Sequence, residues 1–259
     1  MIRLGVCASA DQTGMVAAAG FDYIECALSA TAALDGAGYA SVRDAVLGSP
    51  IRAEVFNLML PGGLPVTGPD FNLIAVRNYL DAALPRAAAM GCRVIVFGSG
   101  GARRVPEGYG KTDAYDDLIA YLRAAGDRCE RYGVTIAIEP LNAAECNIIN
   151  SVAEATWLAN RANHPAVKVL SDNYHSEKDG LSFHEVRASG CLMAHTHVSH
   201  PNRSFPKPGD GYCYGDYFDA LYDINYDSRM SVEGRTDDFA NDLIKAYAVL
   251  DPLRRRHDG

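Results

Sequence analysis

Residues 134–145 read VTIAIEPLNAAE, and this stretch carries signals for both the fold and a site. Residues 134–138 are β-branched or small and apolar, which is typical of a strand buried on both faces. Glu139 follows directly, and Pro140 cannot donate a hydrogen bond to a neighbouring strand, so we expect the strand to end here. A carboxylate at the end of a buried strand is either a paired structural ion or part of a functional site.

The segments on both sides of this strand have helical spacing. In DAYDDLIAYLRAAGDRCERYG (113–133), apolar side chains recur at steps of three and four residues and therefore share one helical face. These side chains are Leu118, Leu122, Ala125 and Cys129. After the strand, Ser151 and Glu154 have the spacing of a capping box, which predicts a helix that runs to about Asn163.

Other helical segments are less regular. Ser182 and Glu185 repeat the capping-box spacing and predict another helix start. Pro85 lies inside the otherwise helical segment 70–90, so we expect a kink or a break there. Between Ala30 and Ser49 the pattern is short and irregular.

Eight short apolar runs recur along the 259 residues, each followed by a helical or irregular segment. They span residues 2–8, 21–28, 51–58, 92–98, 134–139, 166–172, 191–198 and 229–234. This alternation predicts a single α/β domain over residues 1–259, a (β/α)8 TIM barrel. A doubly wound open sheet is the alternative, but it usually has fewer strands and often a GxGxxG turn, which is absent here. We expect residues 252–259 to form an exposed C-terminal tail.

The composition limits the partners. The net charge is −8, from 24 basic and 32 acidic residues, which disfavours a large nucleic-acid interface. No apolar run approaches 18 residues, so we expect no membrane span, and MIRLGVCASADQ (1–12) is typical of a strand rather than a secretion signal. The seven cysteines are scattered without a CxxC pair, which favours reduced thiols in a cytoplasmic protein.

Polar residues close four consecutive strands in the second half of the chain. They are Glu139, Asp172, His197 and Glu233. In a barrel the carboxyl ends of the strands meet at one mouth, so these side chains are expected to lie together, and His195 would point to the same side as His197. Three packed carboxylates repel one another unless a cation neutralises them. An oxygen-rich set with one imidazole suits Mn²⁺, Mg²⁺ or Co²⁺ better than a structural zinc.

Four motifs carry a family resemblance. They are IEPLNAAE (138–145), SDNYH (171–175), HTHVSHPNR (195–203) and SVEGR (231–235). Together they resemble the metal-site motifs of the xylose-isomerase-like TIM barrel superfamily, and within it the ketose 3-epimerases of the D-tagatose/D-psicose group. The resemblance implies a divalent metal, Mn²⁺ before Mg²⁺ or Co²⁺, a small-molecule sugar as substrate, and a homo-oligomer, either a dimer or a tetramer.

The resemblance also implies roles for individual residues. Glu139 and Glu233 would bind the metal and act as the catalytic acid and base, while Asp172 and His197 would complete the metal ligands. Further residues would bind the substrate, namely Glu145, His175 and Arg203.

The segment after the fourth apolar run suggests an additional contact. GSGGARRVPEGYG (98–110) is rich in glycine, and Arg103 or Arg104 could bind an anionic group of the substrate, such as a phosphate or a carboxylate, with Arg103 assigned to the substrate. The alternative is a tight turn with arginines that face solvent.

These residues predict proton abstraction next to a carbonyl. A carboxylate takes the proton, and the cation stabilises the resulting enediolate. Return of a proton to the same carbon gives epimerisation, and return to the adjacent carbon gives isomerisation. The alternative is elimination by a metal-dependent lyase, as in the C-glycoside-cleaving enzymes, with a partner subunit if one is required.

Two other function classes are disfavoured. An apurinic-site endonuclease needs more ligands at the first-half strand ends, where this chain has Glu25 and Asn57, and it needs a basic surface. A non-catalytic binding module would be expected to have lost part of the ligand set, which is intact here.

Overall fold

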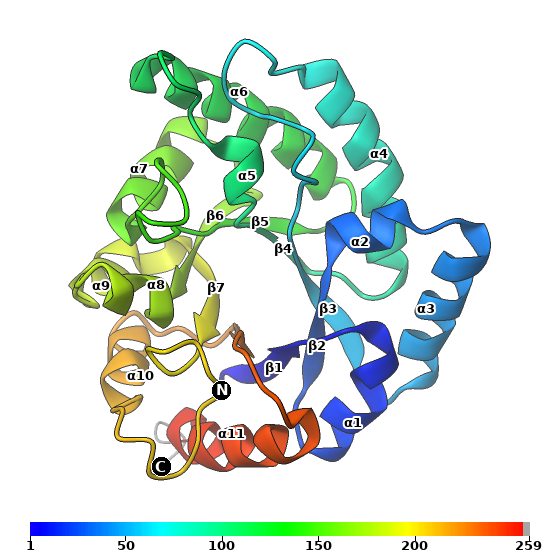
Figure 1. Ribbon diagram of the computed structural model, residues 1–259, viewed down its shortest axis with the longest axis vertical. Coiled ribbons are helices and arrows are strands. Elements are labelled where there is room, and N and C mark those ends of the chain that lie inside the picture. Colours follow the sequence, from blue (N-terminus) through cyan, green and yellow to red (C-terminus); the bar gives the residue numbers. More distant parts are fainter. Residues whose placement is uncertain (256–259) are drawn as a thin grey trace.

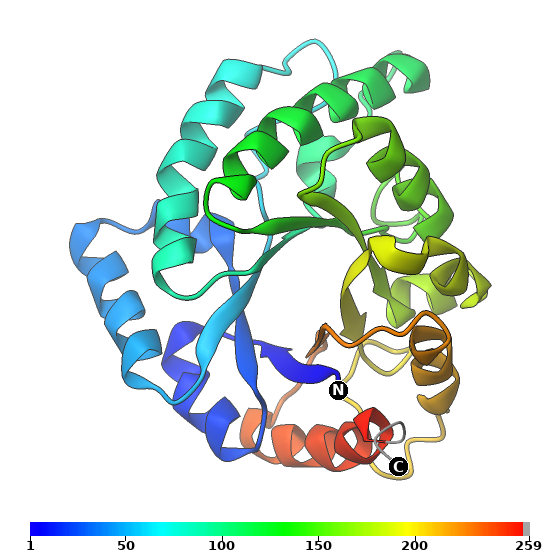
Figure 2. The ribbon, with the colours of Figure 1, turned by 180° about the vertical axis from the view of Figure 1, so that it is seen from behind.

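The computed structural model describes residues 1–255, and its centre is a closed barrel of eight parallel strands in chain order. Figure 1 shows the ring of strands with the helices outside it, and Figure 2 shows the same ring from behind. The strands are β1 (Arg3–Cys7), β2 (Tyr23–Ala27), β3 (Arg52–Asn57), β4 (Val94–Phe97), β5 (Thr135–Ile138), β6 (Val167–Asp172), β7 (Met193–Val198) and β8 (Arg229–Val232). The predicted (β/α)8 barrel is confirmed, and each expected run contains one strand.

The helices connect successive strands. They are α1 (Thr13–Ala18), α2 (Leu28–Ala33), α3 (Gly36–Gly48), α4 (Leu73–Ala89), α5 (Gly100–Arg103), α6 (Lys111–Glu130), α7 (Val152–Ala162), α8 (Asn173–Lys178), α9 (His184–Ser189), α10 (Gly215–Tyr222) and α11 (Phe239–Arg254). Two short 3₁₀ helices are η1 (Ala10–Gln12) and η2 (Gly190–Leu192). The irregular segment between Ala30 and Ser49 thus contains most of α2 and all of α3.

Two apolar cores hold the barrel together. The larger core lies between the strands and the surrounding helices, as expected when parallel strands are covered on their outer face. The smaller core fills the barrel interior and consists of Tyr23, Val55, Val94, Val96, Ala137 and Leu170. Tyr23 is accommodated because β1 has glycine at position 5, where a Cβ would lie 2.2 Å from the tyrosine ring. The interior is therefore a packed layer beneath the mouth of the barrel.

Both helices expected after a serine are present, but neither has a complete capping box. The Ser151 side chain accepts a hydrogen bond from the Glu154 N–H, and α7 runs to Asn163, its C-cap in a left-handed conformation, whereas the Glu154 carboxylate accepts from the Ile149 and Asn150 N–H groups. After Ser182, α9 begins at His184 as predicted, but Glu185 accepts from the Ala153 N–H of the neighbouring helix start. Helix α4 is not broken at Pro85, which lies inside the continuous helix.

The C-terminal tail begins later than expected. Residues 252–254 form the last turn of α11, and Arg254 is buried, with Nη1 in an ion pair with Asp22. The expectation of an exposed tail over 252–259 is therefore wrong for this turn, and residues 256–259 lie outside the described part of the chain. Among residues 1–255, no helix is both long and apolar enough to cross a lipid bilayer.

Candidate metal and active site

The mouth of the barrel brings together the four strand-end residues expected there. One donor atom from each of Glu139, Asp172, His197 and Glu233 lies within 4.8 Å of every other. His197 Nδ1 lies 3.0 Å from Glu139 Oε1 and 3.1 Å from Glu233 Oε2. Asp172 is the register partner of His197 on adjacent strands, so their Cα atoms are side by side. The predicted grouping of these four side chains is present in the structure.

Glu139 enters the mouth because a glycine faces it. The residue follows β5, and its N–H continues the ladder by donating to the Phe97 carbonyl. Its Oε2 atom lies only 1.7 Å from the position that a Cβ on Gly98 would occupy. Any side chain at position 98 would therefore displace the carboxylate. The glycine-rich composition of residues 98–110 is the only sequence signal for this close approach at Gly98.

Asp172 is fixed by the helix that follows it. It is the last residue of β6 and the N-cap of α8, where Oδ1 accepts a hydrogen bond from the Tyr174 N–H at 2.8 Å. The other oxygen, Oδ2, faces the site and lies 3.4 Å from Arg203 Nη1 and 3.6 Å from His175 Nε2. One oxygen therefore holds the side chain, and the other points toward the candidate metal position.

A buried carboxylate on β2 orients His197. Glu25 Oε1 lies 3.0 Å from His197 Nε2, and Glu25 Oε2 lies 3.0 Å from His195 Nε2. Both histidines point into the barrel, as the HTH spacing predicts. Because Nε2 is engaged by Glu25, Nδ1 of His197 is the nitrogen that faces Glu139 and Glu233. No local sequence pattern predicts this contact, because Glu25 lies 172 residues from His197.

The Arg203 side chain contacts two carboxylates of the cluster, Asp172 and Glu233. Nη2 is 2.9 Å from Glu233 Oε2, Nη1 is 3.4 Å from Asp172 Oδ2, and the guanidinium lies over the Tyr174 ring. Its backbone has φ of 68°, the left-handed region that is costly for a residue other than glycine. The chain thus holds Arg203 in an unfavourable conformation while its side chain bridges two of the candidate metal ligands.

A cavity of about 340 Å³ opens above these residues. The predicted substrate contacts Glu145, His175 and Arg203 all line it, together with Glu139 and Glu233. Asn142, which sequence reasoning missed, joins two of them. Its side-chain Nδ2 lies 2.8 Å from both Glu145 Oε1 and His175 Nδ1.

Arg103 does not face the cavity, and the prediction that it binds a substrate anion is wrong. The residue is fully buried, and its guanidinium donates to the Phe97 carbonyl at 2.7 Å and to the Glu139 carbonyl at 2.6 Å. The neighbouring Arg104 is exposed and donates to the Glu145 carbonyl. The two arginines therefore stabilise loops at the barrel mouth, and Arg103 fixes the backbone of β4 and β5 next to Glu139.

The packed charges shift the pKa values of the cluster. Burial raises the pKa of Asp172 to about 7, with a further contribution from Glu233, and burial also raises the pKa of Glu139. Burial would lower the pKa of His197, but Glu25, Glu233 and Glu139 outweigh it and raise that pKa well above its ordinary value. At Glu233, His197 and Arg203 outweigh burial and hold the pKa at about 2. The site therefore has a strong affinity for positive charge.

The donor set fits a divalent cation. Donors that bind one ion at about 2.0–2.5 Å lie within roughly 5 Å of one another, which matches the 4.8 Å limit of this group. Three carboxylates and one imidazole favour Mn²⁺, Mg²⁺ or Co²⁺ over soft metals that prefer thiolates. Cys7 lies close by and forms a smaller group with Glu25 and His197.

Comparison with known proteins places these residues in a wider group. Residues 14–253 match the family described as xylose isomerase-like TIM barrel. An L-ribulose 3-epimerase from Methylomonas sp. (strain DH-1) is 26% identical over 224 residues, which span 84% of this chain and 75% of that protein. A 3-dehydro-D-guloside 4-epimerase from Escherichia coli (strain K12) is 30% identical over 131 residues, 49% of this chain and 47% of that protein. Several such relatives are matched over less than half of their length.

The fold is shared with solved epimerase structures. A crystal structure of D-psicose 3-epimerase in the presence of D-fructose superposes with a TM-score of 0.86, at 20% sequence identity and with all of both chains covered. At this identity the likeness concerns the fold.

Proposed function

This chain belongs to the xylose isomerase-like TIM barrel family, and we propose that it is a divalent-metal-dependent epimerase or isomerase of a ketose or related keto-sugar. The observation that carries the proposal is the convergence of Glu139 and Glu233 on His197 Nδ1 at the floor of a cavity of monosaccharide size. The matched relatives, which include sugar 3- and 4-epimerases, support the same chemistry.

The chain's own residues supply the proton transfers. A divalent cation held by Glu139, Asp172, His197 and Glu233 would stabilise negative charge on the substrate oxygens next to the reacting carbon. Glu139 Oε1 faces His197, while Oε2 lies against Gly98, which lines the cavity. Oε2 is therefore the oxygen best placed to exchange a proton with a carbon next to the carbonyl. Glu233, which follows β8, is the second carboxylate of the acid–base pair in this proposal.

Three other residues orient the sugar in this proposal. Glu145 offers an exposed carboxylate to the cavity, Arg203 offers guanidinium N–H groups, and the buried His175 offers its imidazole ring. Burial and the Arg203 charge lower the pKa of His175 to about 3, so its imidazole is neutral at physiological pH. A neutral imidazole next to a guanidinium can bind hydroxyl or carbonyl oxygens without adding another charge.

The test is proton exchange in D₂O. Metal-stripped protein is supplied with Mn²⁺ and a pool of free ketoses, ketose phosphates and keto-sugar acids, and deuterium incorporation is followed by NMR. We expect exchange at a carbon next to the carbonyl, and we expect Glu139→Gln and Glu233→Gln to abolish it. A product that differs at that carbon indicates an epimerase, and an aldose product indicates an isomerase. Stoichiometric Mn²⁺ binding without exchange in any compound would contradict the proposal and favour the elimination chemistry considered above.

A further inference from the structure

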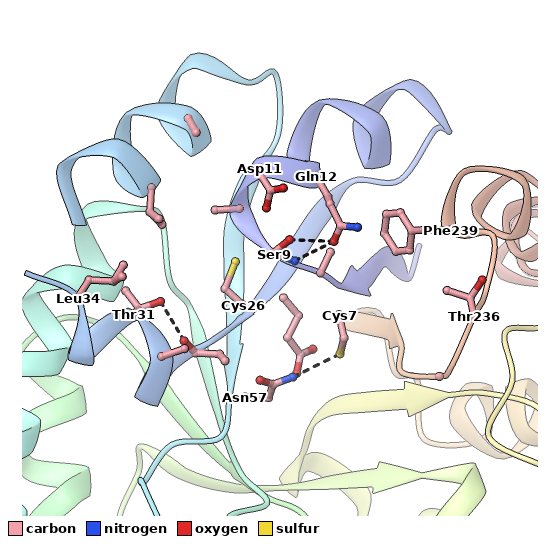
Figure 3. A pocket seen from close by; sticks show the side chains of 18 of the residues that line it. Cys7, Ser9, Asp11, Gln12, Cys26, Thr31, Leu34, Asn57, Thr236 and Phe239 are labelled. Atoms are coloured by element: carbon pink, nitrogen blue, oxygen red, sulfur yellow. Dashed lines mark hydrogen bonds between the residues drawn. The ribbon is translucent and has the colours of Figure 1, made fainter. Parts of the chain in front are cut away.

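A second and larger cavity of about 840 Å³ lies beside the candidate site (Figure 3). Its walls come from the ends of β1 and β2, from η1, α2 and α3, and from the segment that follows β8. Asn57 lines both this cavity and the smaller one. Cys7 and Glu25 also line it, and their donor atoms lie within 4.8 Å of a His197 nitrogen. The larger cavity therefore adjoins the proposed site of reaction.

Small residues keep this cavity open. The chain leaves β1 as Cys7, Ala8, Ser9 and Ala10, and helices α2 and α3 contribute Ala30 and Ala45. No bulky side chain from these segments crosses the space. Larger apolar side chains border it at Leu34 and Phe239 (Figure 3). At about 840 Å³ the cavity lies within the range of ligand pockets, roughly 300–1,000 Å³, and can hold a further group of a substrate whose sugar occupies the 340 Å³ cavity.

Several polar groups that line the cavity already have partners within the protein. Gln12 Oε1 accepts hydrogen bonds from the Ser9 N–H and hydroxyl, and the Thr31 hydroxyl donates to the Ala27 carbonyl. The Asn57 amide lies 3.5 Å from the Cys7 sulfur. The alanine, leucine and phenylalanine walls offer no hydrogen-bond partner to the hydroxyls of a second sugar ring, so such a ring would gain little there. An apolar group would lose no hydrogen bond on entry and would gain contact with the alanine, leucine and phenylalanine walls.

The charges that border the cavity disfavour a strongly anionic ligand. Glu25 and Asp11 face it, and Arg235 is the one basic residue among those that line it in the described chain. A phosphate would therefore meet two carboxylates and a single guanidinium.

We propose that the substrate is a keto-sugar that carries an uncharged apolar group, such as an aryl or alkyl glycoside, with the apolar group in the cavity of Figure 3. The sugar then occupies the smaller cavity above Glu139 and Glu233, and the glycosidic oxygen passes near Asn57. This inference rests on the proposed function, since it places the ketone of the sugar next to those carboxylates.

Binding of matched probes tests the inference. Methyl and p-nitrophenyl 3-keto-glucopyranosides and D-fructose are titrated into the Mn²⁺-loaded enzyme by calorimetry. We expect the p-nitrophenyl compound to bind at least tenfold more tightly than the methyl compound. Ala30→Trp, which fills the cavity from α2, should abolish this advantage while leaving the affinity for the methyl compound unchanged. Ala45→Phe fills the cavity from α3 and provides an independent second variant.

The matched control is Ala120→Trp, an exposed alanine on the outer helix α6 that lines neither cavity, and it should keep the full preference. Equal affinity for the two glycosides, or a preference that survives both cavity-filling variants, would overturn the inference. A change of oligomeric state in Ala30→Trp alone would also overturn it, because a second copy of the chain would then be the occupant.

Failure of the inference can be told apart from failure of the proposed function. Deuterium exchange with free ketoses and no preference for the aryl glycoside would keep the function and reject the apolar subsite. If the aryl glycoside binds preferentially and Ala30→Trp removes this preference, but no deuterium exchange occurs, the apolar subsite is kept and the epimerase chemistry is rejected.

Discussion

A single missing side chain decides whether Glu139 can occupy the mouth of the barrel. A Cβ at position 98 would lie 1.7 Å from Glu139 Oε2, whereas a Cβ at Gly101 would meet nothing within 4 Å. We predict that Gly98→Ala displaces the carboxylate and lowers kcat for deuterium exchange by about 10²-fold, because a shift of about 1 Å can have that effect. Gly101→Ala, on the same cavity wall, should retain normal kcat. Equal rates in the two variants would show that Glu139 does not need this position.

Glu25 is expected to act on the metal through His197. Its carboxylate lies 3.0 Å from His197 Nε2, an arrangement that fixes the ring and raises its basicity at the other nitrogen. We predict that Glu25→Gln weakens Mn²⁺ binding about 10–100-fold, measured by titration of metal-stripped protein with detection of free Mn²⁺ by EPR.

The control for the Glu25→Gln variant is Glu54→Gln. Glu54 is also a carboxylate on the barrel wall, but it pairs with Arg3 and Arg229 and belongs to no group of metal donors among the described residues. Its variant should bind Mn²⁺ normally. If both variants lose affinity equally, the effect comes from general destabilisation of the barrel and the positioning role is rejected.

At the scale of elements, Arg103 joins the ends of β4 and β5. Its guanidinium donates to two carbonyls, and Arg103→Met would leave both without this donor in a buried position. We predict a loss of roughly 2–4 kcal/mol in the free energy of unfolding, measured by urea denaturation in the presence of Mn²⁺. Arg104→Met, at the exposed neighbouring residue, should cost about 1 kcal/mol or less. A stable Arg103→Met protein with weakened binding of anionic sugars would instead restore the role first expected for this residue.

At the scale of the whole molecule, the charge cluster links stability to pH. Burial raises the pKa of Asp172 to about 7 and also raises that of Glu139, so below about pH 7 these two carboxyls bind protons more tightly in the metal-free folded protein than in the unfolded chain, whereas burial lowers the pKa of His175 to about 3 and acts in the opposite direction. The contribution of Asp172 to the free energy of unfolding of metal-stripped protein should therefore fall as the pH rises from about 4 to 7. Urea denaturation at pH 5 and pH 7.5 measures the change, and Asp172→Asn should reduce it.

Metal binding should reverse this trend. The ligands must lose their protons to bind Mn²⁺, so the stabilisation by Mn²⁺ should be larger at pH 7.5 than at pH 5. A free Mn²⁺ concentration of about 100 times Kd would add about 2.7 kcal/mol to the free energy of unfolding. The same stabilisation at both pH values would mean that Mn²⁺ binds away from the titrating carboxylates.

The sequence by itself determined the barrel and the four candidate metal ligands. β-branched runs specify buried parallel strands through local periodicity, and the carboxyl ends of parallel strands meet at one mouth whatever the loops do. The sequence alone therefore groups four residues, Glu139, Asp172, His197 and Glu233. In the structure their donor atoms lie within 4.8 Å of one another.

Only the tertiary structure decided which other side chains reach that mouth. Arg103 turns inward because the Phe97 and Glu139 carbonyls lie within its reach, and no local pattern distinguishes it from the exposed Arg104. Glu25 contacts histidines 170 and 172 residues away, a pairing set by strand register around the closed barrel. The larger cavity likewise depends on small residues from segments far apart in the chain. Sequence periodicity reports which face of an element is buried, whereas the partner on that face is fixed only when the barrel closes.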